Sequence, residues 1–103
     1  MSKTTDDGRI AAGQWLRKAR LQIGKTQQEV ARLVGFEYYS MITGIEAGRA
    51  RVPSSRYADY ARALGMDPKD FAREMIRYYD PDTWKILFSG NNVSHLRRER
   101  CSQ

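Results

Sequence analysis

The chain has 103 residues, about the length of one domain, which excludes a large enzyme with a separate cofactor domain. Its 18 Lys and Arg residues outnumber 12 Asp and Glu residues, and the net charge of +6 favours a polyanionic partner. The single cysteine, Cys101, excludes an intrachain disulfide framework and favours a reducing, cytoplasmic setting, and no run approaches the roughly 18 apolar residues of a membrane span.

The first predicted element is an amphipathic helix from Ile10 to Ile23, preceded by a disordered arm over residues 1–8. The arm is polar and shows no hydrophobic periodicity. Within the helix, apolar residues recur three and four positions apart, as one buried face requires: Ala12, Leu16, Ala19 and Ile23. Gly24 then supplies the left-handed residue that commonly ends a helix.

Two short helices with a turn between them are predicted next. Thr26 and Glu29 have the spacing of a capping box, which marks the start of the first of these helices. Its inner face comprises Val30, Ala31 and Val34, and Gly35 ends it. The second helix is marked by Met41, Ile42 and Ile45 and is closed by Gly48. Two short helices joined through a glycine-containing turn are typical of a helix-turn-helix unit.

The C-terminal half begins with two further predicted helices. Pro53 and the serines after it start a fourth helix, whose apolar face comprises Tyr57, Tyr60, Ala61 and Leu64. Asp67 as N-cap and Pro68 as the first helical residue start a fifth, whose apolar face comprises Phe71, Met75 and Tyr78 or Tyr79. After a break at residues 80–82, residues 83–88 fit either a helical turn or a strand, and residues 89–103 are expected to be a flexible tail.

The positive charge is concentrated in the N-terminal part of the chain. Between positions 9 and 62 there are ten Lys and Arg residues against four acidic residues, which accounts for a charge of +6. We therefore expect the polyanionic partner to contact this N-terminal part of the chain.

From residue 14 to about residue 64 the sequence resembles the Cro/C1-type (XRE-like) helix-turn-helix regulators of bacteria and phages. The matching segments are Leu16–Arg20, Thr26–Ala31, Val34–Gly35, Ile42, Ile45–Gly48, Pro53 and the turn Ala63–Asp67. The resemblance implies an all-α fold: a five-helix, lambda repressor-like domain over residues 9–80, followed by a short C-terminal extension. It further implies double-stranded DNA as the partner, with the third helix in the major groove.

The resemblance also assigns roles to individual residues. Base contacts are expected from Tyr38, Tyr39, Ser40 and Thr43, with one of the two tyrosines pointing outward and the other half-buried. Phosphate contacts are expected from Gln27, Gln28, Arg17, Lys25, Arg49 and Arg51. For the two loop arginines the alternative is a merely solvated turn. Gly44 departs from the family, which often has a long polar base reader at that position.

Arg20 and Glu46 match a family pair that forms a partly buried salt bridge, and the alternative is two unrelated solvated charges. The apolar residues Trp84, Leu87 and Phe88, within a segment at 81–88, are interpreted either as a cap over the fifth helix or as a homodimer interface, which we favour. His95 is interpreted as a solvated histidine of the tail rather than a catalytic residue.

The sequence thus predicts a dimeric repressor that binds a palindromic operator in the cytoplasm. An antitoxin-like module of the same fold, which binds a partner protein and regulates its own operon, is the alternative. Enzymatic activity is not expected, because the sequence has no glycine-rich phosphate loop and no paired-carboxylate motif. No cofactor, metal, membrane or small-molecule effector is expected either.

Overall fold

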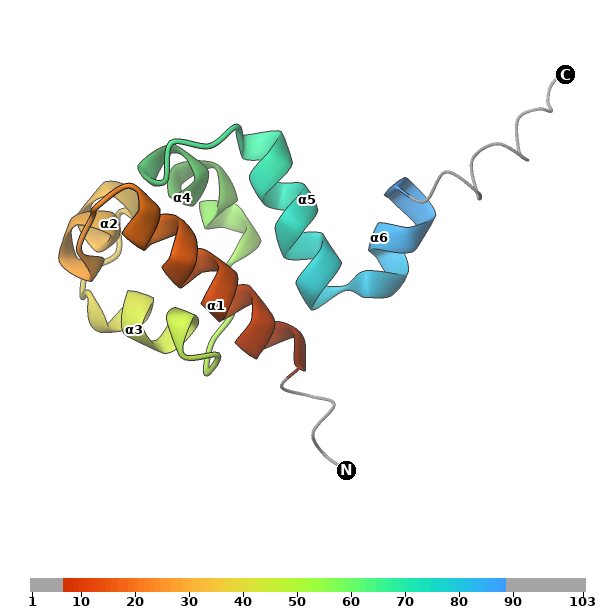
Figure 1. Cartoon of the computed structure of the whole chain (residues 1–103), viewed down its shortest axis with the longest axis horizontal. Helices are drawn as coiled ribbons and strands as arrows, with labels where there is room; N and C mark the ends of the chain where they lie inside the picture. Colours follow the sequence, from red (N-terminus) through yellow and green to blue (C-terminus); the bar gives the residue numbers. More distant parts are fainter. Residues whose placement is uncertain (1–6, 89–103) are drawn as a thin grey trace, which may run out of the picture.

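Residues 7–88 are described by the computed structural model, and within this range the chain forms helices and no strands (Figure 1). The elements are α1 (Asp7–Gln22), α2 (Gln27–Val34), α3 (Ser40–Glu46), the 3-10 helix η2 (Ser54–Arg56), α4 (Tyr57–Ala63), α5 (Pro68–Tyr79) and α6 (Pro81–Phe88). The predicted all-α domain of five helices with a short C-terminal extension is confirmed. None of the helices in this range is long and apolar enough to cross a bilayer.

The core lies between α1, the α2–α3 pair and the α4–α5 pair. Helix α1 packs on α3 and α5, α2 packs on α3 and α4, and α4 packs on α5. Phe71 of α5 is completely buried and stacks on Tyr60 with ring centroids 5.5 Å apart, while Trp15 and Tyr57 meet it edge-on. This aromatic cluster ties α1, α4 and α5 together and leaves α2 and α3 on the opposite side of α1 from α6 (Figure 1).

The capping residues act as their spacing predicts. The Glu29 backbone N–H donates to Thr26 Oγ1 at 3.0 Å, and the Thr26 N–H donates to the Glu29 carboxylate at 2.8 Å, which completes the capping box of α2. This second bond lowers the pKa of Glu29. Asp67 accepts from the Lys69 N–H at 2.8 Å and caps α5. Helix α2 ends at Gly35, whose φ of 94° is left-handed.

The ends of α1 differ from the prediction. The helix begins at Asp7, inside the segment predicted as a disordered arm, because Gly8 lies against the end of α5, where a Cβ would overlap the carbonyl oxygen of Tyr78. The helix ends at Gln22, so Ile23 falls beyond it and is 42% exposed rather than part of the buried face. Residues 1–6 of the predicted arm and the predicted tail over residues 89–103 lie outside the described residues.

Residues 83–88, for which the sequence fits either a helical turn or a strand, are helical and belong to α6. The Asp80 carboxylate accepts from the Thr83 N–H at 3.2 Å and from the Thr83 hydroxyl at 2.6 Å, which caps the start of the helix and lowers the pKa of Asp80. Arg73 of α5 lies over the Phe88 ring, with its Cζ 5.2 Å from the ring centroid. Helix α6 therefore packs on α5, while Leu87 remains exposed.

Candidate nucleic-acid interface

Helices α2 and α3 form the helix-turn-helix unit, and their buried inner faces determine which side chains face solvent. Those inner residues are Val30, Ala31, Val34, Ile42 and Ile45. At the start of α3, Tyr38 is 63% exposed and Tyr39 is 51% exposed, and Ser40 is exposed as well. Neither tyrosine is part of the core, and Tyr39, the less exposed of the two, still has about half of its surface open to solvent.

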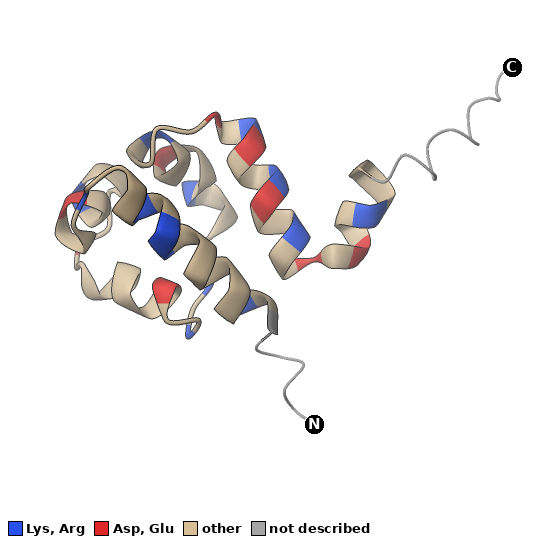
Figure 2. Ribbon diagram, in the orientation of Figure 1, with Lys and Arg blue, Asp and Glu red and all other residues tan. Residues whose placement is uncertain are grey.

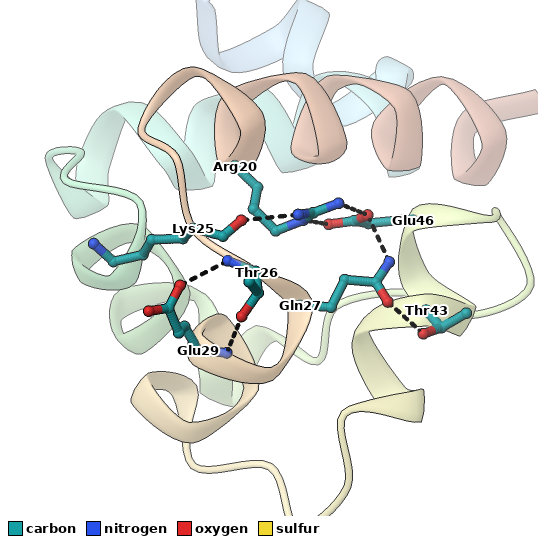
Figure 3. A network of polar contacts seen from close by, with 7 residues as sticks. All are labelled: Arg20, Lys25, Thr26, Gln27, Glu29, Thr43 and Glu46. Carbon is teal, nitrogen blue, oxygen red and sulfur yellow. Dashed lines mark hydrogen bonds and ion pairs between the residues drawn. The ribbon is translucent and has the colours of Figure 1, made fainter.

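A network of polar side chains connects α1, α2 and α3 behind this surface (Figure 3). Arg20 of α1 and Glu46 of α3 form a buried, two-pronged salt bridge, with Nε to Oε2 at 2.7 Å and Nη2 to Oε1 at 3.1 Å. Arg20 Nη1 also donates to the Lys25 carbonyl at 2.8 Å. Hydrogen bonding to Glu46 raises the pKa of Arg20 although its burial opposes this. The pair therefore fixes the end of α3 against α1.

Gln27, the first residue of α2, extends this network to the outer side of α3. Its Nε2 donates to Glu46 Oε1 at 3.0 Å, and its Oε1 accepts from the Thr43 hydroxyl at 2.7 Å. Figure 3 shows the Gln27 amide lying between Glu46 and Thr43. Gln27, an expected phosphate contact, is thus hydrogen-bonded directly to Thr43, an expected base contact.

The expected DNA-contacting residues do not all lie together. Lys25, Gln27 and Gln28 line one shallow hollow with Tyr39. Arg17 is exposed but lies on α1 beside a separate hollow, together with Lys18. Figure 2 shows that α3 is almost uncharged, since Glu46 is its one ionisable residue, and that basic residues occur on α1 and in the loop after α3.

The two loop arginines have different surroundings. Both are exposed, but Arg51 lies over the Tyr79 ring at 5.0 Å from its centroid and donates to the Tyr79 carbonyl at 3.3 Å. The Tyr79 hydroxyl in turn accepts from the Val52 N–H at 3.1 Å, and burial raises the pKa of this tyrosine. Arg51 therefore also holds the loop to the end of α5.

Sequence reasoning missed two features of this surface. Met41, one of the three apolar residues that mark this helix in the sequence, is 45% exposed, because it lies one position before the buried Ile42 and so about 100° around the helix. The bonds of Gln27 to Thr43 and Glu46 span 16 and 19 residues, and no spacing in the sequence signals them. Within residues 7–88, no three His, Cys, Asp or Glu side chains gather as metal ligands.

Gly44 is an interior residue of α3 with unused space around it. A Cβ at this position would meet no heavy atom within 4 Å. We expect Gly44→Ala to raise the free energy of unfolding by about 1 kcal/mol, because glycine is that much less favourable than alanine inside a helix. Urea unfolding of the two proteins measures this difference, and a less stable alanine variant would show that the site is not open.

Comparison with known proteins agrees with this geometry. A family model described as a helix-turn-helix domain matches residues 11–73. Among solved structures, the chain is similar to the high-resolution crystal structure of the restriction-modification controller protein C.AhdI from Aeromonas hydrophila. That likeness has a TM-score of 0.55 and 31% sequence identity, and it covers 60% of this chain and 88% of that chain. No curated protein sequence matches the chain.

The family match covers more than half of the chain and includes α2, the turn and α3. The same unit carries the exposed side chains at the start of α3 and the polar network behind them. The chain therefore belongs to the helix-turn-helix domain family and is a DNA-binding transcription regulator of the Cro/C1 type.

Proposed function

We propose that this regulator is a sequence-specific, dimeric repressor that inserts α3 into the major groove of a palindromic operator. The observation that carries the proposal is the exposed, uncharged start of α3, on a helix whose other end is fixed to α1 by the buried Arg20–Glu46 salt bridge. A helix of this kind presents its N-terminal residues to base edges, and neighbouring segments contact phosphates. Tyr38, Tyr39 and Ser40 are the proposed base contacts, together with Thr43.

Phosphate contacts are proposed for the polar and basic residues that flank α3: Gln27, Gln28, Lys25, Arg49, Arg51 and, further along α1, Arg17. Lys25 and the two glutamines lie at the start of α2, where backbone N–H groups and the helix dipole also favour an anion. Binding across a promoter by such contacts would exclude RNA polymerase, which is the basis for proposing repression. The likeness to a restriction-modification controller protein supports a role in controlling a set of genes.

The proposed dimer interface is on α6. Leu87 is 53% exposed and Phe88 is 39% exposed, and Trp84 packs beside Phe88 with ring centroids 6.0 Å apart. Ile86, which is 64% exposed, extends this apolar surface. Regulators with this unit bind half-sites about 34–36 Å apart as dimers, so two-fold symmetry of the protein accounts for a palindromic operator.

Genome-wide mapping of bound sites, followed by gel shifts on the mapped sequences, tests this function. We expect an enriched sequence with two-fold symmetry, two chains on each duplex by sedimentation, and higher transcription from the bound promoter when the protein is removed. Equal competition by random DNA at physiological salt would contradict sequence specificity. A single chain on each duplex would contradict the dimer, and recovery of a bound small protein instead of DNA would favour the antitoxin-like alternative.

Arg49→Ala and Arg51→Ala separate a phosphate contact from a structural one. Each is expected to weaken binding to all DNA sequences and to lower the slope of log affinity against log salt by about one. Only Arg51→Ala should also lower the melting temperature, because it loses its contacts with Tyr79. Arg62→Ala is the matched control, since Arg62 is exposed on α4 and paired with Asp59. An unchanged salt slope for Arg49→Ala would contradict its role.

A further inference from the structure

Thr43 lies where the polar network reaches the outer face of α3. It is half-buried and follows Tyr39 by four positions and Ser40 by three, so helical periodicity places the three residues on one face. Gly44, the next residue, has no side chain, and a Cβ there would meet no heavy atom within 4 Å, so Gly44 does not cover its neighbour. Thr43 is therefore within reach of a surface that approaches α3.

The direction of each hydrogen bond in the network follows from Glu46. Both of its carboxylate oxygens face the guanidinium of Arg20, and an ionised carboxylate accepts hydrogen bonds and cannot donate them. Gln27 must therefore present its Nε2 to Glu46, in the contact of 3.0 Å. This orientation of the amide places its Oε1 on the opposite side, toward Thr43 (Figure 3).

The orientation of Gln27 determines what the Thr43 hydroxyl offers to a ligand. An amide oxygen carries no hydrogen, so Thr43 Oγ1 is the donor in the contact of 2.7 Å with Gln27 Oε1. A hydroxyl has one hydrogen and two lone pairs. With its hydrogen engaged, Thr43 Oγ1 is left with lone pairs and can only accept a hydrogen bond from DNA.

We propose that Thr43 reads an amino-bearing base, adenine or cytosine, and discriminates against guanine or thymine at the same place. The inference rests on the proposed function, in which α3 occupies the major groove. There adenine N6 and cytosine N4 are donors, whereas guanine O6 and N7 and thymine O4 are acceptors. A threonine hydroxyl without a partner can donate or accept and so distinguishes bases poorly. Gln27 removes the donating role and thereby gives Thr43 a base preference.

Selection of bound duplexes from a randomised pool tests the proposal with four proteins. The wild-type protein should enrich adenine or cytosine over guanine or thymine at one position, by about three- to tenfold. Thr43→Val should abolish the preference at that position, because it removes the hydroxyl at nearly constant shape. Gln27→Leu should admit guanine and thymine there, because it frees the hydroxyl hydrogen. Gln22→Leu is the matched control and should keep the wild-type preference, since Gln22 is exposed at the end of α1, is not among the proposed DNA contacts, and is not the partner of Thr43.

A second measurement is made first on the wild-type protein, so its main result does not depend on the folding of a variant. If the selected base is adenine, it is replaced by purine, which lacks the 6-amino group; if it is cytosine, it is replaced by 2-pyrimidinone, which lacks the 4-amino group. We expect affinity to fall about three- to tenfold. The loss should be absent for Thr43→Val.

Three results would overturn the inference while leaving the proposed function intact: enrichment of guanine or thymine where Thr43→Val changes the preference, an unchanged preference in Gln27→Leu, or full affinity for the base analogue. A wild-type protein that enriches no sequence would contradict the proposed function and overturn the inference with it.

Discussion

Replacement of Glu46 by alanine is expected to lower the free energy of unfolding by about 3–5 kcal/mol, because it leaves a charged partner buried. The guanidinium of Arg20, a residue only 8% exposed, would lose both hydrogen bonds to Glu46. Of the bonds described above, it would keep the one to the Lys25 carbonyl. The Gln27 amide would lose its acceptor as well. Urea unfolding followed by circular dichroism measures the change.

Two further variants show whether the loss comes from the pair itself. Glu37→Ala removes an exposed glutamate from the turn before α3 and should change the free energy of unfolding by less than about 0.5 kcal/mol. The double variant Arg20→Met with Glu46→Leu should lose less than the sum of the two single losses, because neither charge is left buried alone. A loss below about 1 kcal/mol in Glu46→Ala would contradict a buried, coupled pair.

Gly13→Ala is expected to destabilise the fold by about 1–3 kcal/mol through overpacking. Helix α1 crosses the end of α3 so closely that a Cβ at position 13 would overlap the Glu46 carbonyl oxygen and lie 2.6 Å from that of Ile45. These are backbone atoms, so the clash is relieved only by moving one helix away from the other. This value is the net loss, after the roughly 1 kcal/mol that alanine gains in helix propensity.

Gly44→Ala is the matched control for Gly13→Ala, because it makes the same change in another helix where a Cβ meets nothing. Thermal unfolding should therefore move in opposite directions for the two variants. A Gly13→Ala protein as stable as the wild type would show that α1 and α3 can separate at little cost. The shift of α1 should also weaken DNA binding, since Arg20 of the same helix holds Glu46.

Helix positions could be predicted from the sequence wherever the signal is local. The capping box at Thr26, the Asp67–Pro68 start of α5 and the buried face of α2 all follow from spacing along one element. The start of α1 could not be predicted, because its first turn is held by α5 rather than by its own residues. The helical character of α6 had a usable signal, since Asp80 and Pro81 repeat the Asp–Pro start seen in α5.

Less of the candidate site than of the fold could be predicted from the sequence. The motif identified α3 and the Arg20–Glu46 pair, but the link from Gln27 to Thr43 depends on how α2 and α3 cross. The exposure of both tyrosines depends on the path of the turn before α3. The contact of Arg51 with Tyr79 joins residues 28 positions apart, and charge counting treats such an arginine as free for DNA.

The double attachment of Gln27 to α3 has a consequence for protein engineering. Its one amide is bonded to both Thr43 and the buried Glu46, so the orientation of the Thr43 hydroxyl depends on a residue of α2. A chimera that receives only residues 40–46 would have the same amino-acid sequence in α3 but would lack Gln27 and Arg20, whose side chains hold Thr43 and Glu46. Transplanting this recognition element intact requires Gln27 and Arg20 in the recipient, so the transferable unit is drawn from three helices.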